Sequence, residues 1–505
     1  MDLGAKGRGS AVTLTTFMLL LAPACAQGVG LGDSGGSVTV RATGTGTTPT
    51  DTSASATEPD SSSGEPDDTG SSAATSTGGE SSSSSGGEES SSGGDGTTGD
   101  DLPQAELYPF DRVHSPISVA VADAMRVIAT TADKNPGVFT RVGGSISASP
   151  DFHKCFADDP AIQGLPAEPT LVTTISHFRM VDLGGSNSWN HVGAAAMAGW
   201  NSDMLVAGMP TPVGTEITAI LPGFAHVLLG THDLEKDTPE ALWAFADNLL
   251  DVVDELSDGG VVPVLSTIPL RGDKPAAALL VPRFNGVIRA VAQGRQIPLL
   301  DLNLAIGKLP MKGLAAEGVD LSVFASAGEN RPCYFSEAAL QFGYNVHNLE
   351  SLRALDRARQ VVVDVAPSLD DPGPMLLGTG TAADPIRIPS LPFVDLRSTG
   401  DSPSDIIDNY GGACDVAVDE SGPERFYRLE IAAPVTVRAM VFDRDPVNVD
   451  LHVLTGVGPD TCIKRHEQEI AGPLPPGTYY LAVDSNGGMV PGGAAGEYAL
   501  VILLE

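Results

Sequence analysis

The hydrophobic positions between residues 102 and 364 follow two alternating patterns. Four short apolar runs, rich in β-branched residues, have the length of buried strands. Longer segments between them repeat apolar residues at helical spacing, as Leu242, Phe245 and Leu249 do. Strands that alternate with helices predict an α/β domain whose parallel sheet is covered by helices on both faces. The predicted strands are residues 136–142, 224–229, 260–267 and 297–301, and the two long predicted helices are residues 239–256 and 276–293.

From residue 393 the pattern changes to short runs that alternate apolar and polar residues, with turn residues between them. This period of two predicts an antiparallel β-sandwich for residues 393–505. Residues 365–392 are rich in Pro, Gly and Asp and are expected to form a linker after the domain of residues 102–364. The predicted sandwich strands are residues 426–431, 435–441, 449–454, 478–483 and 497–502.

The N-terminal residues are expected to lie outside both domains. Residues 1–26 are typical of an export signal, because basic residues precede a short apolar run and small residues follow it. Cys25 resembles the lipidated cysteine of a bacterial lipoprotein, which would hold the protein on the outer membrane or cell surface. Cleavage near Ala26, which would release a soluble secreted protein, is the alternative. Residues 27–101 are dominated by Ser, Gly, Thr, Asp and Glu and are expected to be a disordered tether or spacer.

Charge and cysteine usage narrow the classes of function. The formal net charge of −35 argues against nucleic acid as a partner. Beyond Cys25, two cysteines fall in each predicted domain, which favours disulfides in an exported chain. We expect the pairs Cys155–Cys333 and Cys414–Cys462, although the sequence alone does not determine connectivity. No Cys-x-x-Cys motif or Cys/His cluster indicates zinc, and no motif indicates a cofactor.

A serine follows the first predicted strand. Residues 143–145, Gly-Gly-Ser, come where an open parallel sheet binds its ligands, at the carboxyl end of a strand. This stretch resembles the first block, Gly-Asp-Ser, of the SGNH/GDSL hydrolases, with Gly144 in place of the Asp. The resemblance implies a flavodoxin-like three-layer fold for residues 102–364. It also implies that Ser145 stands at the nucleophile position of an ester hydrolase.

Later parts of the chain resemble the remaining blocks of that family in the same order. Gly199 matches the glycine block, whose amide helps to stabilise the oxyanion. Residues 230–233 match the Gly-x-Asn-Asp block, with His232 in place of the oxyanion-stabilising Asn. In the last block Glu317 stands at the position of the orienting Asp, and Asp320 stands at the position of the general base, His.

An aspartate at the position of the base changes the expected chemistry. A carboxylate is a far weaker base than an imidazole, and Asp320 is too short to connect Ser145 with Glu317. One interpretation is a pseudoenzyme whose cleft binds an ester or glycan ligand without hydrolysing it. A second is an active esterase, lipase or deacetylase in which His232 or His347 serves as the base. A third is a surface scaffold whose function lies in the sandwich.

The C-terminal region carries a resemblance of its own. Val-Asp-Leu at residues 449–451 is followed by Pro-Gly-Thr-Tyr-Tyr at 476–480 and Gly-Glu-Tyr at 496–498. This order resembles the pre-peptidase C-terminal domain of secreted bacterial enzymes. The resemblance implies attachment or binding, and no catalysis, for this part of the chain.

Overall fold

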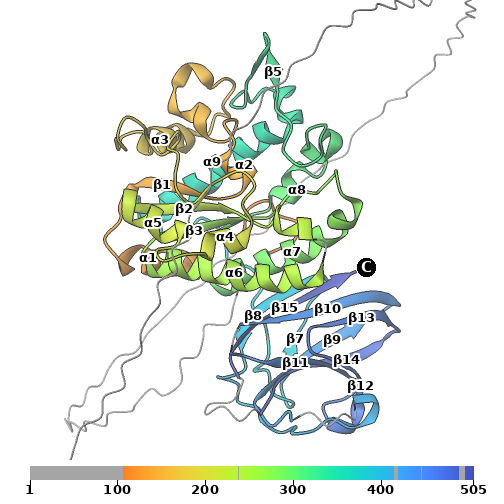
Figure 1. The fold of residues 1–505 in the computed structure, drawn as a ribbon. Coiled ribbons are helices and arrows are strands. Elements are labelled where there is room, and N and C mark those ends of the chain that lie inside the picture. Colours follow the sequence, from red (N-terminus) through yellow and green to blue (C-terminus); the bar gives the residue numbers. More distant parts are fainter. Residues whose placement is uncertain (1–105, 237, 415–418, 445, 488–494) are drawn as a thin grey trace, which may run out of the picture. The chain divides into compact units, whose positions relative to one another are not determined.

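The N-terminal folded part is built around a parallel sheet (Figure 1). The computed structural model describes residues 106–236, 238–414, 419–444, 446–487 and 495–505. The expected export signal, Cys25 and the low-complexity segment lie outside these residues. The strand order is β1-β2-β3-β4, with every pair parallel. The strands are β1 (Asn135–Gly143), β2 (Pro222–Leu228), β3 (Val262–Ser266) and β4 (Leu299–Leu300).

A short segment continues this sheet on the outer side of β1. The amide of Gly143 donates to the carbonyl of Ala195, and the amide of Met197 donates to the carbonyl of Gly143. The bridge between Gly143 and Ala196 is parallel. This pairing brings the segment before Gly199 beside the end of β1, where the Ser145 stretch begins.

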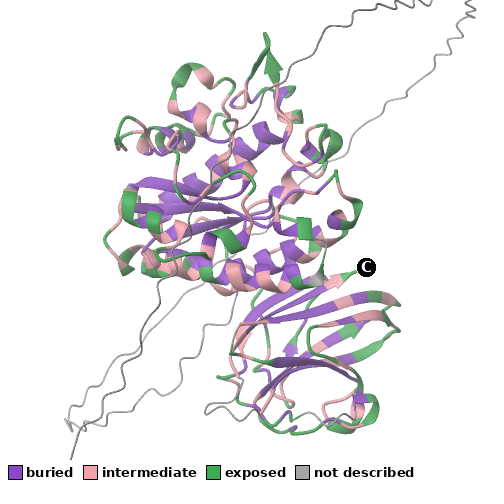
Figure 2. Ribbon diagram, viewed as in Figure 1, coloured by how far each residue is buried: buried purple, intermediate pink, exposed green. Residues whose placement is uncertain are grey.

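Helices cover both faces of the sheet. Figure 1 shows α6 (Pro239–Asp258) and α7 (Pro275–Gly294) on one face, with α3 (Pro169–His177) and α9 (Gly343–Val362) on the other. The strands between these layers are buried apart from the first two residues of β1, and every residue of β2 is buried (Figure 2). The predicted α/β fold is therefore confirmed. The remaining helices and short strands are α1 (Val119–Thr131), α2 (Ser145–Ala148), α4 (Ser202–Val206), α5 (Pro212–Ile220), α8 (Leu302–Ile306), β5 (Ala325–Ser326) and β6 (Glu329–Asn330).

The C-terminal part is a sandwich of two sheets, as the alternating pattern predicts. One sheet has the order β13-β10-β15-β8, and the other has the order β12-β11-β14-β9-β7. Neighbours are antiparallel except for β7 and β9, which are parallel. The strands are β7 (Ile386–Arg387), β8 (Phe393–Ser398), β9 (Glu424–Ile431), β10 (Val435–Asp443), β11 (Val449–Leu454), β12 (Cys462–His466), β13 (Glu469–Leu474), β14 (Gly477–Ser485) and β15 (Glu497–Leu504).

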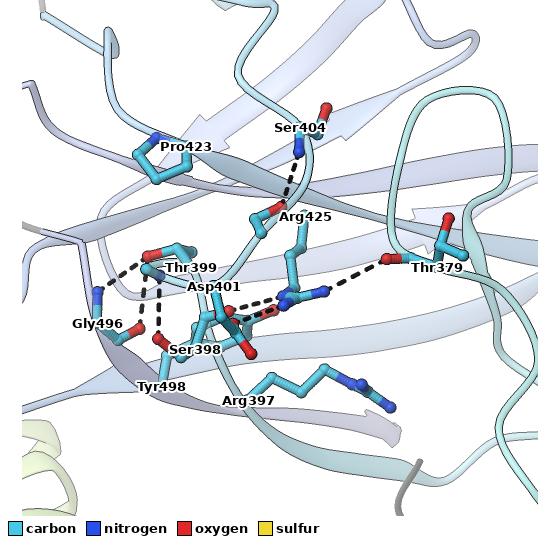
Figure 3. A network of polar contacts seen from close by, with 12 residues as sticks. Thr379, Arg397, Ser398, Thr399, Asp401, Ser404, Pro423, Arg425, Gly496 and Tyr498 are labelled. Atoms are coloured by element: carbon cyan, nitrogen blue, oxygen red, sulfur yellow. Dashed lines mark hydrogen bonds and ion pairs between the residues drawn. The ribbon is translucent and has the colours of Figure 1, made fainter. Parts of the chain in front are cut away.

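The segment expected to be a linker is fastened to the sandwich. It supplies β7, and a buried arginine, Arg425, binds the chain on either side of β7 (Figure 3). The Arg425 guanidinium donates to the carbonyls of Ser398 at 2.6 Å and Thr379 at 3.3 Å, and to the Asp401 carboxylate at 2.6 Å. All three guanidinium nitrogens thus have a hydrogen-bond partner, which a buried arginine requires.

Glycines on α7 let the sandwich pack closely against this helix. A Cβ at Gly294 would lie 2.3 Å from Cβ of Leu396, and one at Gly286 would lie 2.5 Å from Cγ1 of Val501. Leu396 and Val501 are buried in the same hydrophobic core as the helices of the α/β domain. The two expected disulfides, Cys155–Cys333 and Cys414–Cys462, are both confirmed. No helix in the described part of the chain is long and apolar enough to cross a membrane.

Candidate functional site

The Gly-Gly-Ser stretch ends β1 and starts α2, with Ser145 as the first helical residue. Gly143 has a φ of +143°, which L-residues with side chains rarely adopt. A Cβ there would lie 2.0 Å from the carbonyl oxygen of Leu228 on the neighbouring strand. Only glycine fits this turn, and the turn leaves Ser145 half-buried at the carboxyl end of the sheet.

The Ser145 hydroxyl is hydrogen-bonded to Asp320, its oxygen Oγ lying 2.9 Å from Oδ1 of the carboxylate. The structure therefore brings together the two residues that stand at the nucleophile and base positions. Asp320 lies in a loop closed by a bridge between Leu314 and Leu321. Gly318 of this loop accepts a 2.7 Å hydrogen bond from the amide of Gly272, which follows β3 along the chain. The catalytic roles expected for these residues remain predictions.

Glu317 lies close to Asp320 but binds its backbone. Oε1 of Glu317 accepts a hydrogen bond from the amide of Asp320 at 3.3 Å. An ionised Asp320 carboxylate has no proton to donate, so Glu317 cannot orient it as an acidic residue orients a histidine ring. Glu317 thus fixes the loop that presents Asp320.

His232 lies beside the serine turn, next to Gly144. Its Nδ1 is 3.2 Å from Oε1 of Glu235, and its Nε2 is buried without a hydrogen-bond partner. Because a carboxylate only accepts, Nδ1 carries the proton and a neutral ring presents a lone pair at Nε2. A neutral His232 therefore cannot donate to an oxyanion as the family Asn does; only the imidazolium could.

The loop that carries His232 is rigidly held. The buried Arg271 guanidinium donates to the Thr231 carbonyl at 2.7 Å and binds Asp273 at 2.8 Å. Asp233 accepts hydrogen bonds from the Ser202 amide and hydroxyl, and burial raises the pKa of its carboxyl. These contacts determine the position of the imidazole before any ligand binds.

Glu235 is the residue at this site that sequence reasoning missed. It lies in the 3₁₀ turn Asp233–Lys236, three residues after His232. Side chains three residues apart meet on such a turn. The spacing His-x-x-Glu is a signal that could have indicated the pair.

A small pocket lies between the serine turn and the loop that carries His232. Gly199, predicted to donate its amide, is exposed with a φ of +83°, and the neighbouring Trp200 reaches the pocket. Whether the Gly199 amide serves an oxyanion therefore remains a prediction. The pocket is lined by Gly144, Ser145, Ile146, Trp200, Leu228, Gly230, Thr231 and His232.

His347 is not a base for Ser145, so that part of the second interpretation is wrong. Its side chain is fully buried on α9 and stacks on Phe152, with ring centroids 4.1 Å apart. Neither ring nitrogen has a hydrogen-bond partner among the described residues, and burial holds the pKa of His347 well below its usual range. Residues 343–362 form a helix, and the position of His347 on that helix points its ring into the core. Among the described residues, no three His, Cys, Asp or Glu side chains are arranged to hold a metal ion.

Comparisons with known proteins give likenesses of fold. No protein-family model and no curated protein matches the chain. The chain is similar to a GDSL-like lipase from Bacteroides thetaiotaomicron at 12% identity, with a TM-score of 0.29, over 47% of this chain and 99% of that one. It is similar to a catalytic mutant of an acetylxylan esterase from Geobacillus stearothermophilus at 15% identity, with a TM-score of 0.28, over 45% and 96%.

The sandwich has a likeness of its own. It is similar to the pre-peptidase C-terminal domain of a collagenase from Bacillus anthracis at 16% identity, with a TM-score of 0.16, over 23% of this chain and 91% of that domain. These likenesses accompany the α/β and sandwich architecture seen in the structure, and they assign no activity.

Proposed function

We propose that this chain is an exported protein of SGNH/GDSL-hydrolase-like fold whose cleft binds an ester or glycan ligand and hydrolyses it poorly. The observation that supports this is the hydrogen bond from Ser145 to a carboxylate at the position of the base. Within the described residues, the hydrogen bonds of the Ser145 side chain include none to an imidazole. Loss of the base of a serine triad reduces turnover on the order of 10⁶-fold.

The experiment is an ester-hydrolysis assay with aryl acetate, butyrate and octanoate. We expect kcat/KM below about 10² M⁻¹s⁻¹ for each, against roughly 10⁴–10⁸ M⁻¹s⁻¹ for ordinary enzymes. Robust hydrolysis that disappears in Ser145→Ala would show that the protein is an active serine esterase. A glycan-binding screen on the same protein tests the ligand, with Ser145→Trp, which fills the pocket, as the control.

A specific observation favours an active esterase as the second candidate function. The buried, unpartnered Nε2 of His232 lines the same pocket as Ser145, and Glu235 holds the opposite ring nitrogen. If Ser145 turned its hydroxyl away from Asp320, His232 could accept the proton and Glu235 could stabilise the imidazolium. In that case His232→Gln and Glu235→Gln would both abolish hydrolysis, and Asp320→Asn would not.

Export and anchoring belong to the same proposal. The two disulfides support an oxidising compartment, because such bonds persist there and are rare in the cytosol. We propose that a lipid on Cys25 attaches the protein to a membrane. Radiolabelled fatty acid should enter the protein and be absent from Cys25→Ala. Label retained in that variant would leave a secreted protein without this anchor.

A further inference from the structure

A cavity of about 200 Å³ lies between the two sheets of the sandwich. Its walls are aliphatic side chains of both sheets together with Tyr479, and most of them belong to the core of the sandwich. It lies beside the point where the chain passes from β12 in one sheet to β13 in the other.

Small residues on neighbouring strands of one sheet explain why the core leaves this space. On β13, Ile470, Gly472 and Leu474 lie at alternate positions and so face the same side of the sheet. Gly472 pairs with Val437 on β10, and Ile470 pairs with Ala439. A Cβ at Gly472 would meet nothing within 4 Å except Nζ of Lys464, at 3.9 Å. Ala439 and Gly472 therefore leave space on this face of the sheet that larger side chains would fill.

A single lysine borders the cavity. Lys464 pairs with Val453 across β11 and β12, so its side chain leaves the sheet on the face where Val453 is buried. Its Nζ donates to the carbonyl of Ala471 at 2.6 Å and stays exposed to solvent. An ammonium group has three protons, so two remain available to an anion.

We propose that this cavity binds a linear aliphatic carboxylate, with the chain between the sheets and the carboxylate on Lys464. Apolar cavities exclude water and accept apolar ligands. A volume of about 200 Å³ is smaller than the roughly 300–1,000 Å³ of sites for drug-sized molecules, which favours a single unbranched chain. One cation next to an aliphatic wall favours a ligand that has one anionic end.

In the alternative explanation of this cavity, Lys464 binds no ligand. An inward-pointing charge on an edge strand discourages pairing with other chains, and β12 is an edge strand. In that case the cavity would be a packing defect, and aliphatic carboxylates would not bind to it. Titration distinguishes the two explanations.

The experiment titrates the full chain with octanoate by calorimetry and follows the methyl groups of Ile470 and Leu474 by NMR. Octanoate should bind and shift both methyl groups. Lys464→Met should weaken octanoate binding about ten-fold, the effect of losing one charge-assisted hydrogen bond, and leave binding of neutral octanol unchanged. Lys308→Met, an exposed lysine of the α/β domain, is the matched control and should bind like the parent.

Ala439→Leu fills the cavity and should abolish both octanoate and octanol binding. Since this variant changes the core, its fold is checked by the melting temperature, and the surface variant Lys464→Met tests the proposal independently. Absence of octanoate binding at millimolar concentration, or equal affinity in the parent and Lys464→Met, would overturn the proposal. Binding in the Ser145 pocket would do the same, because it would persist in Ala439→Leu.

Discussion

The imidazole of His232 lies against the backbone of Gly144 and occupies the space that a side chain at position 144 would need. A Cβ there would lie 3.0 Å from Cδ2 of His232 and 2.9 Å from the carbonyl oxygen of Trp200. The size of the residue at position 144 is therefore limited from two sides, by the His232 ring and by the Trp200 carbonyl. We expect positions 144 and 232 to be energetically coupled through the first of these contacts.

This coupling predicts a non-additive pair of variants. Gly144→Asp alone should destabilise the protein by about 1–3 kcal/mol, the usual effect of overpacking. His232→Asn in the same chain should recover part of this loss, because it removes the ring but leaves the Trp200 carbonyl in place. Urea unfolding of both single variants and the double variant gives the coupling energy, which should be at least about 0.5 kcal/mol. Gly458→Asp, whose Cβ meets nothing within 4 Å, is the control; strict additivity would contradict the coupling.

Restoring the base should restore some activity. Asp320→His places an imidazole at the end of the loop that now bonds to Ser145, with Glu317 three residues earlier. We expect ester hydrolysis to rise by roughly 10- to 100-fold, near the lower end of general-base effects. The gain should vanish when Ser145→Ala is added and should not occur in Asp320→Asn. No gain in Asp320→His would mean that the loop holds position 320 in an orientation unsuited to a base.

The core of the α/β domain contains three buried histidines that make its stability depend on pH. His153, His226 and His347 are fully buried, and the ring of His226 lies 5.6 Å from that of His153 and 5.5 Å from that of His347. Burial, and then the charge of Arg141, lowers the pKa of His226 from 6.5 to about 3. Burial also lowers the pKa values of the other two.

Because these histidines bind protons more readily when unfolded, their contribution to stability is full above pH 6.5 and is lost as pH falls; for His226 this loss extends down to about pH 3. Below pH 6.5, each histidine should make the free energy of unfolding fall by up to about 1.4 kcal/mol per pH unit. Urea unfolding at several pH values measures the free energy of unfolding as a function of pH. In His226→Leu its slope should be smaller by up to about 1.4 kcal/mol per pH unit, the value for one proton. An unchanged slope in that variant would exclude His226 as a source of the effect, and His177→Leu, a half-buried histidine at the C-terminal end of α3, is the control.

The sandwich contains a buried carboxyl group with the opposite dependence. Burial, followed by the neighbouring Asp450, raises the pKa of Glu420 from 4.5 to about 8. The folded state thus holds a proton that the unfolded state has lost, so this contribution to stability is present below pH 4.5 and decreases as pH rises through 8. Glu420→Gln keeps the shape of the protonated side chain. It should therefore leave the melting temperature nearly unchanged near pH 5 and raise it at pH 9, while the exposed variant Glu467→Gln changes it at neither.

Local periodicity was enough to predict the layers of this protein. Alternation at β9, β10, β11, β14 and β15 and the helical stripe of α6 depend on residues close together in the sequence, so the sandwich and the helix-covered sheet follow from the chain alone. The position of Ser145 after a buried strand, and the two cysteines in each domain, are equally local signals. The resemblance to the family blocks also assigned Ser145 and Asp320, which lie 175 residues apart in the sequence, to one site, and their side chains are hydrogen-bonded in the structure.

Only the tertiary structure decided which histidine lies at the site. His232 and His347 are both polar residues near matching blocks, yet one lines the serine pocket and the other stacks on Phe152 inside the core. The space that Gly144 leaves for His232, and the space that Gly472 leaves beside Lys464, have the same origin. Each depends on how closely segments distant in the sequence approach one another, and close packing settles that distance only when the whole core has formed.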